Sequence, residues 1–182
     1  MPSSSPFAHA SLRAAAAALL LVVLFGPGAR GVAASAAWNA APFALEQVSV
    51  VRQTRAHSCG PAALATLSAW LGAPRTEAEL LQQASLGPTG ITLSEFSRLA
   101  DGIGFSGAWY QVHHTDLSHV PAPFDAHLQG EGAPALGLLV AVAGVGHGYI
   151  TVADPAAGVH VKPVKQFARR FTGRVFVLEQ RP

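Results

Sequence analysis

The stretch QTRAHSCGPAALATLSAWLG, from Gln53 to Gly72, holds the only cysteine of this 182-residue chain, Cys59. Gly60-Pro61 follows directly, and proline is well tolerated in the first turn of a helix. The alanine- and leucine-rich run after it favours a helix that stops at Gly72. A lone cysteine can form no disulfide within the chain. Cys59 is therefore a buried bystander, an intermolecular link or a reactive thiolate at a helix N-terminus.

Two features next to Cys59 indicate chemistry. A helix N-terminus presents unpaired N–H groups and a partial positive charge, which stabilise a thiolate. Gln53 ends a predicted strand, Val48–Gln53, so its amide could donate to an oxyanion at the same place. This layout resembles that of papain-like cysteine peptidases. On spacing alone, catalysis and a buried structural cysteine both stay open.

The rest of the chain predicts helices first and strands last. Thr76 with Glu79 and Thr92 with Glu95 have the spacing of capping boxes and open two more helices. Strand patterns follow, with one short helix, VKQFARRF, before the last of them. These strands are FSGAWYQV, PFDAHL, LGLLVAVA (Leu136–Ala143), GYITVAD (Gly148–Asp154) and GRVFVLE. The order predicts an α+β fold with N-terminal helices packed on an antiparallel sheet.

The N-terminus has the pattern of an export signal. A weakly basic start precedes the apolar run Ala14–Gly26, which is too short to span a bilayer comfortably, and Ala34-Ser35-Ala36 is the best cleavage match. We expect residues 1–36 to be a signal peptide and 37–182 a single exported, periplasmic domain. A retained N-terminal anchor is the alternative.

Removing the signal changes the charge balance and the classes of partner. Arg13 and Arg30 precede the cut, so ten of the twelve Lys and Arg remain against ten Asp and Glu. The mature chain is formally neutral, which argues against a nucleic-acid partner. The GxGxxG match at Gly102–Gly107 follows a helix and precedes a strand, the reverse of a dinucleotide site. No phosphate-binding loop with a lysine is present, and we expect no nucleotide and no cofactor.

Three segments together resemble a known family. They are VRQTRAHSCGPAALATL, GITLSEFSRLADGIGFSGAWYQV and YITVADPAAGVHVKPVKQFARRFTGRVFVL. They look like the bacteriocin-processing, double-glycine cysteine peptidases, and most closely like exported single-domain relatives that lack the transporter. The resemblance implies a papain-like fold with Cys59 as nucleophile, Gln53 as oxyanion-hole donor and Asp154 as the residue that orients a histidine. It also implies a glycine-pair peptide as substrate and a secretion system as partner; we expect a monomer.

The catalytic histidine is missing from its usual place. The family has it at the start of the strand before the Asp-Pro segment, where this chain reads ALGLLVAVA. If the hairpin turns at Val145-Gly146, Asp154 faces Gly137 or, one residue on, Leu138. Neither residue accepts a proton. We expect no imidazole beside the Cys59 thiol, and Gly137→His or Leu138→His to raise the activity most.

Three other histidines are candidate substitute bases. His57 lies two residues before Cys59, and His127 lies on the preceding strand candidate. His147 is on or next to the strand of Asp154, roughly 23 Å along it, so Asp154 cannot orient it. For each of them a solvated or packed histidine is the competing interpretation.

Two function classes remain from the sequence, with a third beside them. The first is a working endopeptidase with an unusual base. The second is a catalytically inactive module that binds a glycine-containing peptide or an export partner. The third is a metal-binding module built on the HHTDLSH cluster, although its spacing matches no familiar zinc pattern. That cluster holds His113, His114, Asp116 and His119.

Overall fold

The computed structural model describes residues 48–131 and 137–180. The predicted signal peptide, the cleavage site and the domain start at Ala37 lie outside this range. Three helices come first: α2 (Cys59–Trp70), α3 (Glu77–Gln83) and α4 (Leu93–Gly102). The remaining elements are β1 (Phe105–Gln111), the 3-10 helix η2 (His114–His119), β2 (Phe124–Gln129), β3 (Gly137–Gly146), β4 (Tyr149–Asp154), β5 (Gly158–Pro163), α5 (Val164–Ala168) and β6 (Phe171–Gln180). In the described ranges, no helix is long and apolar enough to cross a membrane.

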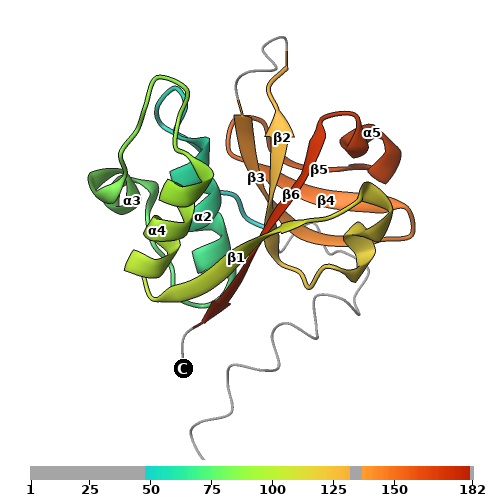
Figure 1. Ribbon diagram of the computed structural model, residues 1–182, viewed down its shortest axis with the longest axis horizontal. Helices are drawn as coiled ribbons and strands as arrows, with labels where there is room; N and C mark the ends of the chain where they lie inside the picture. The colour runs from blue at the N-terminus through green and yellow to red at the C-terminus, as the bar shows by residue number, and fades with distance from the viewer. Residues whose placement is uncertain (1–47, 132–136, 181–182) are drawn as a thin grey trace, which may run out of the picture.

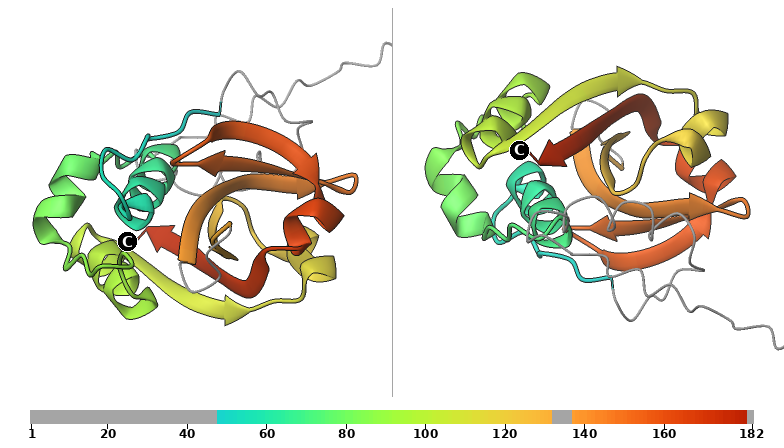
Figure 2. Two further views of the ribbon diagram at one scale, coloured as in Figure 1. Left: turned by 90° about the horizontal axis from the view of Figure 1, so that it is seen from above. Right: turned by 90° about the horizontal axis from the view of Figure 1, so that it is seen from below.

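The six strands form one curved sheet in the order β1-β6-β2-β3-β4-β5, and every neighbouring pair is antiparallel. Helices α2, α3 and α4 gather on one side of this sheet, while η2 and α5 lie at its other end (Figures 1 and 2). The predicted α+β architecture, with N-terminal helices on an antiparallel sheet, is confirmed.

Two apolar clusters lie on the two faces of the sheet. Strand β3 is buried on both, because its side chains alternate between them. Leu139 and Ala141 join the cluster under α2, whereas Val140 and Val142 join the cluster near η2 and α5. Ten of the twelve residues of α2 are buried, from Cys59 to Ser68. The helix that carries Cys59 is therefore a core element.

The two predicted capping boxes differ in the structure. Thr76 and Glu79 form a complete box at the start of α3. At the start of α4, Thr92 accepts a hydrogen bond from the backbone of Glu95, but the Glu95 carboxylate turns to Ser85 and Arg98 instead. Half of the second box is therefore used to fasten the loop before α4. The GxGxxG match at Gly102–Gly107 begins at the end of α4 and continues through a turn, as predicted.

The structure corrects two strand predictions. The segment Val48–Gln53 belongs to no strand, and its backbone N–H groups donate to the Thr66 hydroxyl and the Pro155 carbonyl instead. Strand β3 continues to Gly146, beyond the predicted end at Ala143, and β5 was not predicted. The β3–β4 turn is made by His147 and Gly148, with φ of 52° and 80°. Positive φ at both central residues is the requirement of a type I′ hairpin turn.

Candidate functional site

Cys59 occupies the first residue of α2, where the sequence predicted it. Its side chain is largely buried, with 9% of the residue exposed. Burial raises the pKa of the thiol above its ordinary value. Hydrogen bonds from the backbone of Leu139 and Gly60 act in the opposite direction, and the negative charge of Asp154 raises the pKa further. The net rise keeps Cys59 a neutral thiol at pH 7, which corrects the thiolate expected from the helix N-terminus alone.

Gln53 and Asp154 are brought together by the backbone. The N–H of Gln53 donates to the carbonyl of Pro155 at 3.1 Å, which ties the segment before α2 to the end of β4. The Gln53 side chain donates from Nε2 to the carbonyl of Arg55 at 3.0 Å, rather than to the sulfur. An amide nitrogen carries two hydrogens, so one remains for a ligand. The role of Gln53 as an oxyanion donor stays a prediction.

Asp154 ends β4 and caps the turn that follows it. Its Oδ1 accepts hydrogen bonds from the backbone N–H groups of Ala156 at 2.8 Å and Ala157 at 3.2 Å. This is the turn-capping use of an aspartate. Within the described ranges, no histidine is hydrogen-bonded to its carboxylate. Asp154 is predicted to orient an imidazole, and among the described residues it has no histidine ring to orient.

The register of β3 and β4 corrects the predicted neighbour of Asp154. Ala141 pairs with Ala153, and continuing this register by one residue sets Asp154 opposite Val140, not opposite Gly137 or Leu138. The shift arises because the turn lies at His147-Gly148 and an irregularity interrupts β3 after Val142.

Leu138 nevertheless shares a face with Asp154. Residues opposite each other in an antiparallel pair point to the same face, and so do residues two apart. Leu138 is two residues from Val140, so it is a diagonal neighbour of Asp154. It borders both apolar clusters, the one that contains Val140 and the one that contains Cys59. An imidazole between Cys59 and Asp154 would belong here, and the position holds leucine.

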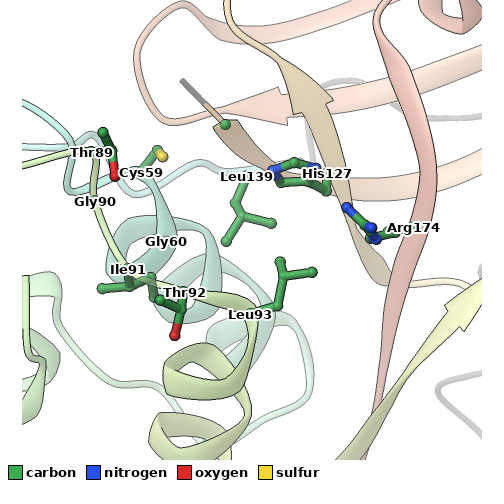
Figure 3. Close-up of a pocket in the computed structure, with 11 residues that line it drawn as sticks. Cys59, Gly60, Thr89, Gly90, Ile91, Thr92, Leu93, His127, Leu139 and Arg174 are labelled. Carbon is green, nitrogen blue, oxygen red and sulfur yellow. The ribbon is translucent and has the colours of Figure 1, made fainter. Parts of the chain in front are cut away.

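Of the three candidate substitute bases, only His127 lies in the cavity of Cys59. That cavity has a volume of about 250 Å³, and Leu139 and Arg174 also line it. Figure 3 shows the side chain of Leu139 between Cys59 and the ring of His127. His57 is exposed in the loop before α2, and His147 lines a different cavity at the β3–β4 turn. Among described residues, no histidine forms a hydrogen bond with Cys59.

Gly60 and Gly137 keep the walls of the cavity close. A Cβ on Gly60 would collide with the side chain of Ile91, and a Cβ on Gly137 would collide with Nε2 of His127. Gly137→His would therefore have to displace the ring of His127. Of the two substitutions predicted from the sequence, the structure favours Leu138→His.

His160 is a histidine that the sequence reasoning did not consider. It lies on β5 opposite Val152, while Asp154 lies opposite Gly158, so His160 and Asp154 are diagonal neighbours. Burial and the charge of Lys162 lower the pKa of His160, and Asp154 acts against them. Strand β5 is on the far side of β4 from β3, so His160 cannot replace a base at position 138.

Glu77 is a second residue that the sequence reasoning missed. It is 4% exposed and lies in the first turn of α3. Its Oε1 accepts from the Ser58 hydroxyl at 2.6 Å, and both carboxylate oxygens lie 3.0 Å from the N–H of Thr54. Ser58 is the residue before Cys59. Glu77 therefore holds both ends of the loop between Gln53 and Cys59. In the sequence, only its position next to the Thr76–Glu79 capping box hinted at a role.

The HHTDLSH cluster is not arranged as a metal site. The rings of His113 and His114 contact each other at 4.3 Å between centroids. In the part of the chain that the structure describes, no three His, Cys, Asp or Glu residues are placed to hold a metal ion.

Comparisons with known proteins agree with this architecture. The model of the peptidase C39 family matches residues 47–182. An uncharacterised protein of Methanothermobacter marburgensis is 34% identical over 131 residues, 72% of this chain and 88% of that protein. A protein of Methanothermobacter thermautotrophicus is 32% identical over the same shares.

Two solved structures show the same fold. The peptidase domain of Streptococcus ComA, a bifunctional ABC transporter of a quorum-sensing pathway, has a TM-score of 0.68 at 22% identity, covering 74% of this chain and 99% of that domain. A double-glycine-motif protease from an AMS/PCAT transporter, solved with its leader peptide, has a TM-score of 0.67 at 22% identity. It covers 74% of this chain and 93% of that one. The predicted likeness to double-glycine peptidases is confirmed.

Proposed function

The chain belongs to the peptidase C39 family, and on that premise we propose that it binds glycine-pair peptides beside Cys59 and cleaves them feebly or not at all. One observation carries the proposal. Leu138 shares a face with Asp154 and packs against the cluster of Cys59, so leucine stands where an imidazole would link the two.

The chemistry explains why this position matters. Cleavage would begin with attack of a thiolate on the carbonyl after the glycine pair, followed by acyl-enzyme formation and hydrolysis. A thiol must lose its proton first, and leucine cannot accept it. The raised pKa of Cys59 leaves little thiolate at neutral pH, so the reaction stops at the bound peptide.

The kind of ligand is supported by the shape of the cavity and by a related complex. The similar AMS/PCAT protease was solved with its leader peptide. Here, Ile91 closes on Gly60 and His127 closes on Gly137, so the space beside Cys59 is narrow. A residue without a side chain suits a narrow site, because its backbone can approach closely.

Binding and turnover can be measured separately. The full chain and a Cys59→Ala variant are titrated with a fluorescent peptide containing Gly-Gly and with a matched Ala-Ala peptide. We expect both proteins to bind the Gly-Gly peptide more tightly, and mass spectrometry to find little or no cleavage. Rapid Cys59-dependent cleavage would mean that the protein is a working peptidase. Equal binding of the Gly-Gly and Ala-Ala peptides would refute the proposed preference for a glycine pair.

We also propose that the domain acts after export, with a mature N-terminus near Ala37. The proposal rests on the apolar run and the Ala34-Ser35-Ala36 match. N-terminal sequencing of protein recovered outside the cytoplasm tests it. A retained Met1 would contradict cleavage and favour an anchor.

A further inference from the structure

The hydrogen bonds of His127 fix which ring nitrogen carries the proton. The hydroxyl of Thr172 donates to the backbone carbonyl of His127 at 3.0 Å. A hydroxyl has one hydrogen, so the Thr172 oxygen can only accept in its 2.9 Å contact with Nδ1 of His127. Nδ1 therefore carries the proton of the neutral ring. Nε2 is left with a lone pair and is a hydrogen-bond acceptor.

A bulge in β6 creates this arrangement. Ala126 pairs with Val175, but Leu128 pairs with Phe171, so β6 has extra residues opposite His127. Among them is Gly173, with φ of 83°, where a Cβ would also collide with the Gln111 amide. The bulge turns Thr172 toward the ring and leaves Arg174 in the cavity. The tautomer of His127 is thus held by the fold of the sheet.

The accepting nitrogen of His127 faces the cavity of Cys59. A Cβ on Gly137 would collide with Nε2, which places the ring edge over that glycine at the cavity wall. Figure 3 shows the ring opposite Cys59 across Leu139. Within residues 48–131 and 137–180, Nε2 has no hydrogen-bond partner. It is free to accept from a ligand.

A glycine pair can be recognised through few groups. It has no side chains, so only close approach and hydrogen bonds to its backbone distinguish it. We propose that Nε2 of His127 accepts a hydrogen bond from a main-chain N–H of the bound glycine pair. This inference rests on the proposed function and identifies His127 as a residue that recognises the backbone of the ligand.

The protonation state of His127 supports this role. Burial lowers the pKa of His127, and the charge of Arg174 lowers it further, so the ring is neutral at pH 7. Arg174 on β6 and Cys59 on α2 are the titratable groups that share the cavity, and β3 contributes Gly137 and Leu139. Acidification protonates Nε2 and removes the acceptor, so this part of the binding energy is lost as the pH falls through the lowered pKa.

The test removes the donor and the acceptor in turn. In the Cys59→Ala background, the full chain is titrated with Gly-Gly peptides in which each glycine is replaced by N-methylglycine. At one position we expect the N-methyl group to weaken binding about 2- to 12-fold, as for loss of one neutral hydrogen bond. In the His127→Ala variant the same replacement should have no further effect. His119→Ala, which changes an exposed histidine outside the cavity, should behave as the parent.

A second variant keeps the test decisive if His127→Ala does not fold. Thr172→Val removes the acceptor of the Nδ1 proton, so the tautomer is no longer fixed and the N-methyl effect should shrink. Independent, multiplicative effects of N-methylation and of either variant would overturn the inference. Failure of the parent protein to bind any Gly-Gly peptide would instead refute the proposed function itself.

Discussion

The cavity of Cys59 has a helix wall, formed by α2 and the loop before it, and a strand wall, formed by the start of β3. The helix wall carries groups suited to catalysis, and the strand wall does not. On the helix wall, Glu77 holds Thr54 and Ser58, and Cys59 stands at the start of a buried helix. On the strand wall, Gly137 and Leu139 line the cavity, and Leu138 between them offers no base. The helix wall also builds the core, so folding requires its residues even without catalysis. An imidazole at position 138 would serve chemistry alone, and leucine there adds apolar packing.

Leu138→His is expected to have the largest effect, because it supplies a general base on the face of Asp154. The imidazole would lie on the face of Asp154, diagonal to it, next to the cluster of Cys59. Positioned general bases contribute about 10²- to 10⁴-fold, so we expect Cys59-dependent cleavage of Gly-Gly peptide to rise at least about 100-fold. Initial rates by chromatography measure it.

Two matched controls sharpen this prediction. Leu138→Asn introduces a polar side chain without a base, and Gly137→His places the ring where it collides with His127. Both should stay inactive. Activity in Gly137→His, with none in Leu138→His, would contradict the β3–β4 register that places position 138 diagonal to Asp154.

Glu77→Ala tests the helix wall. It removes a buried acceptor from Ser58 and Thr54, and we expect it to lower the free energy of unfolding by about 2–4 kcal/mol. Glu79→Ala is the control on the same helix; it removes only the exposed bond from the Thr76 N–H to the Glu79 carboxylate and should cost clearly less. Urea unfolding measures both. Equal losses would mean that Glu77 is an ordinary first-turn residue.

Asp125→Asn should have a pH-dependent effect on the stability of the sheet. Asp125 on β2 is fully buried, and neither carboxylate oxygen has a hydrogen-bond partner in the described ranges. Burial raises its pKa well above the ordinary value, so the folded state prefers the protonated form. Wild-type stability should therefore fall as the pH rises above the unfolded pKa near 3.8, by at most about 1.4 kcal/mol per pH unit, until the raised pKa is passed.

The Asp125→Asn variant shows in which direction Asp125 changes stability with pH. Asp125→Asn cannot ionise, so its stability relative to wild type should rise from pH 3 toward pH 7. Thermal unfolding across this range measures the difference. A constant difference would mean that Asp125 ionises normally in the folded protein.

Much of the fold follows from local sequence signals. Cys59-Gly60-Pro61 predicts the start of α2, and Thr76 with Glu79 predicts α3, because both signals act within one helical turn. The register of the β3–β4 hairpin could not be predicted from such local signals. The run GVGHG offers several turns, and the structure uses one with His147 at positive φ, which is uncommon for a residue other than glycine.

The parts of the site that depend on distant contacts could not be predicted. Glu77 bonds to Thr54, 23 residues earlier, and nothing in its own segment shows this. The raised pKa of Cys59 depends on burial and on Asp154, which lies 95 residues later. The lack of a histidine at positions 137 and 138 could be seen in the sequence, because this required only the resemblance and the order of the strands.

The pH dependence of Cys59 alkylation tests the central claim most directly. Iodoacetamide reacts with the thiolate, so its rate reports the ionisation of the one cysteine of the chain. For wild type we expect one ionisation, above the ordinary cysteine pKa of about 9, and slow labelling below it. In Leu138→His, labelling should extend to neutral pH, as a thiolate–imidazolium pair forms. A plateau of fast labelling between pH 5 and 7 in the wild-type protein would show that a base already serves Cys59, and would contradict the account.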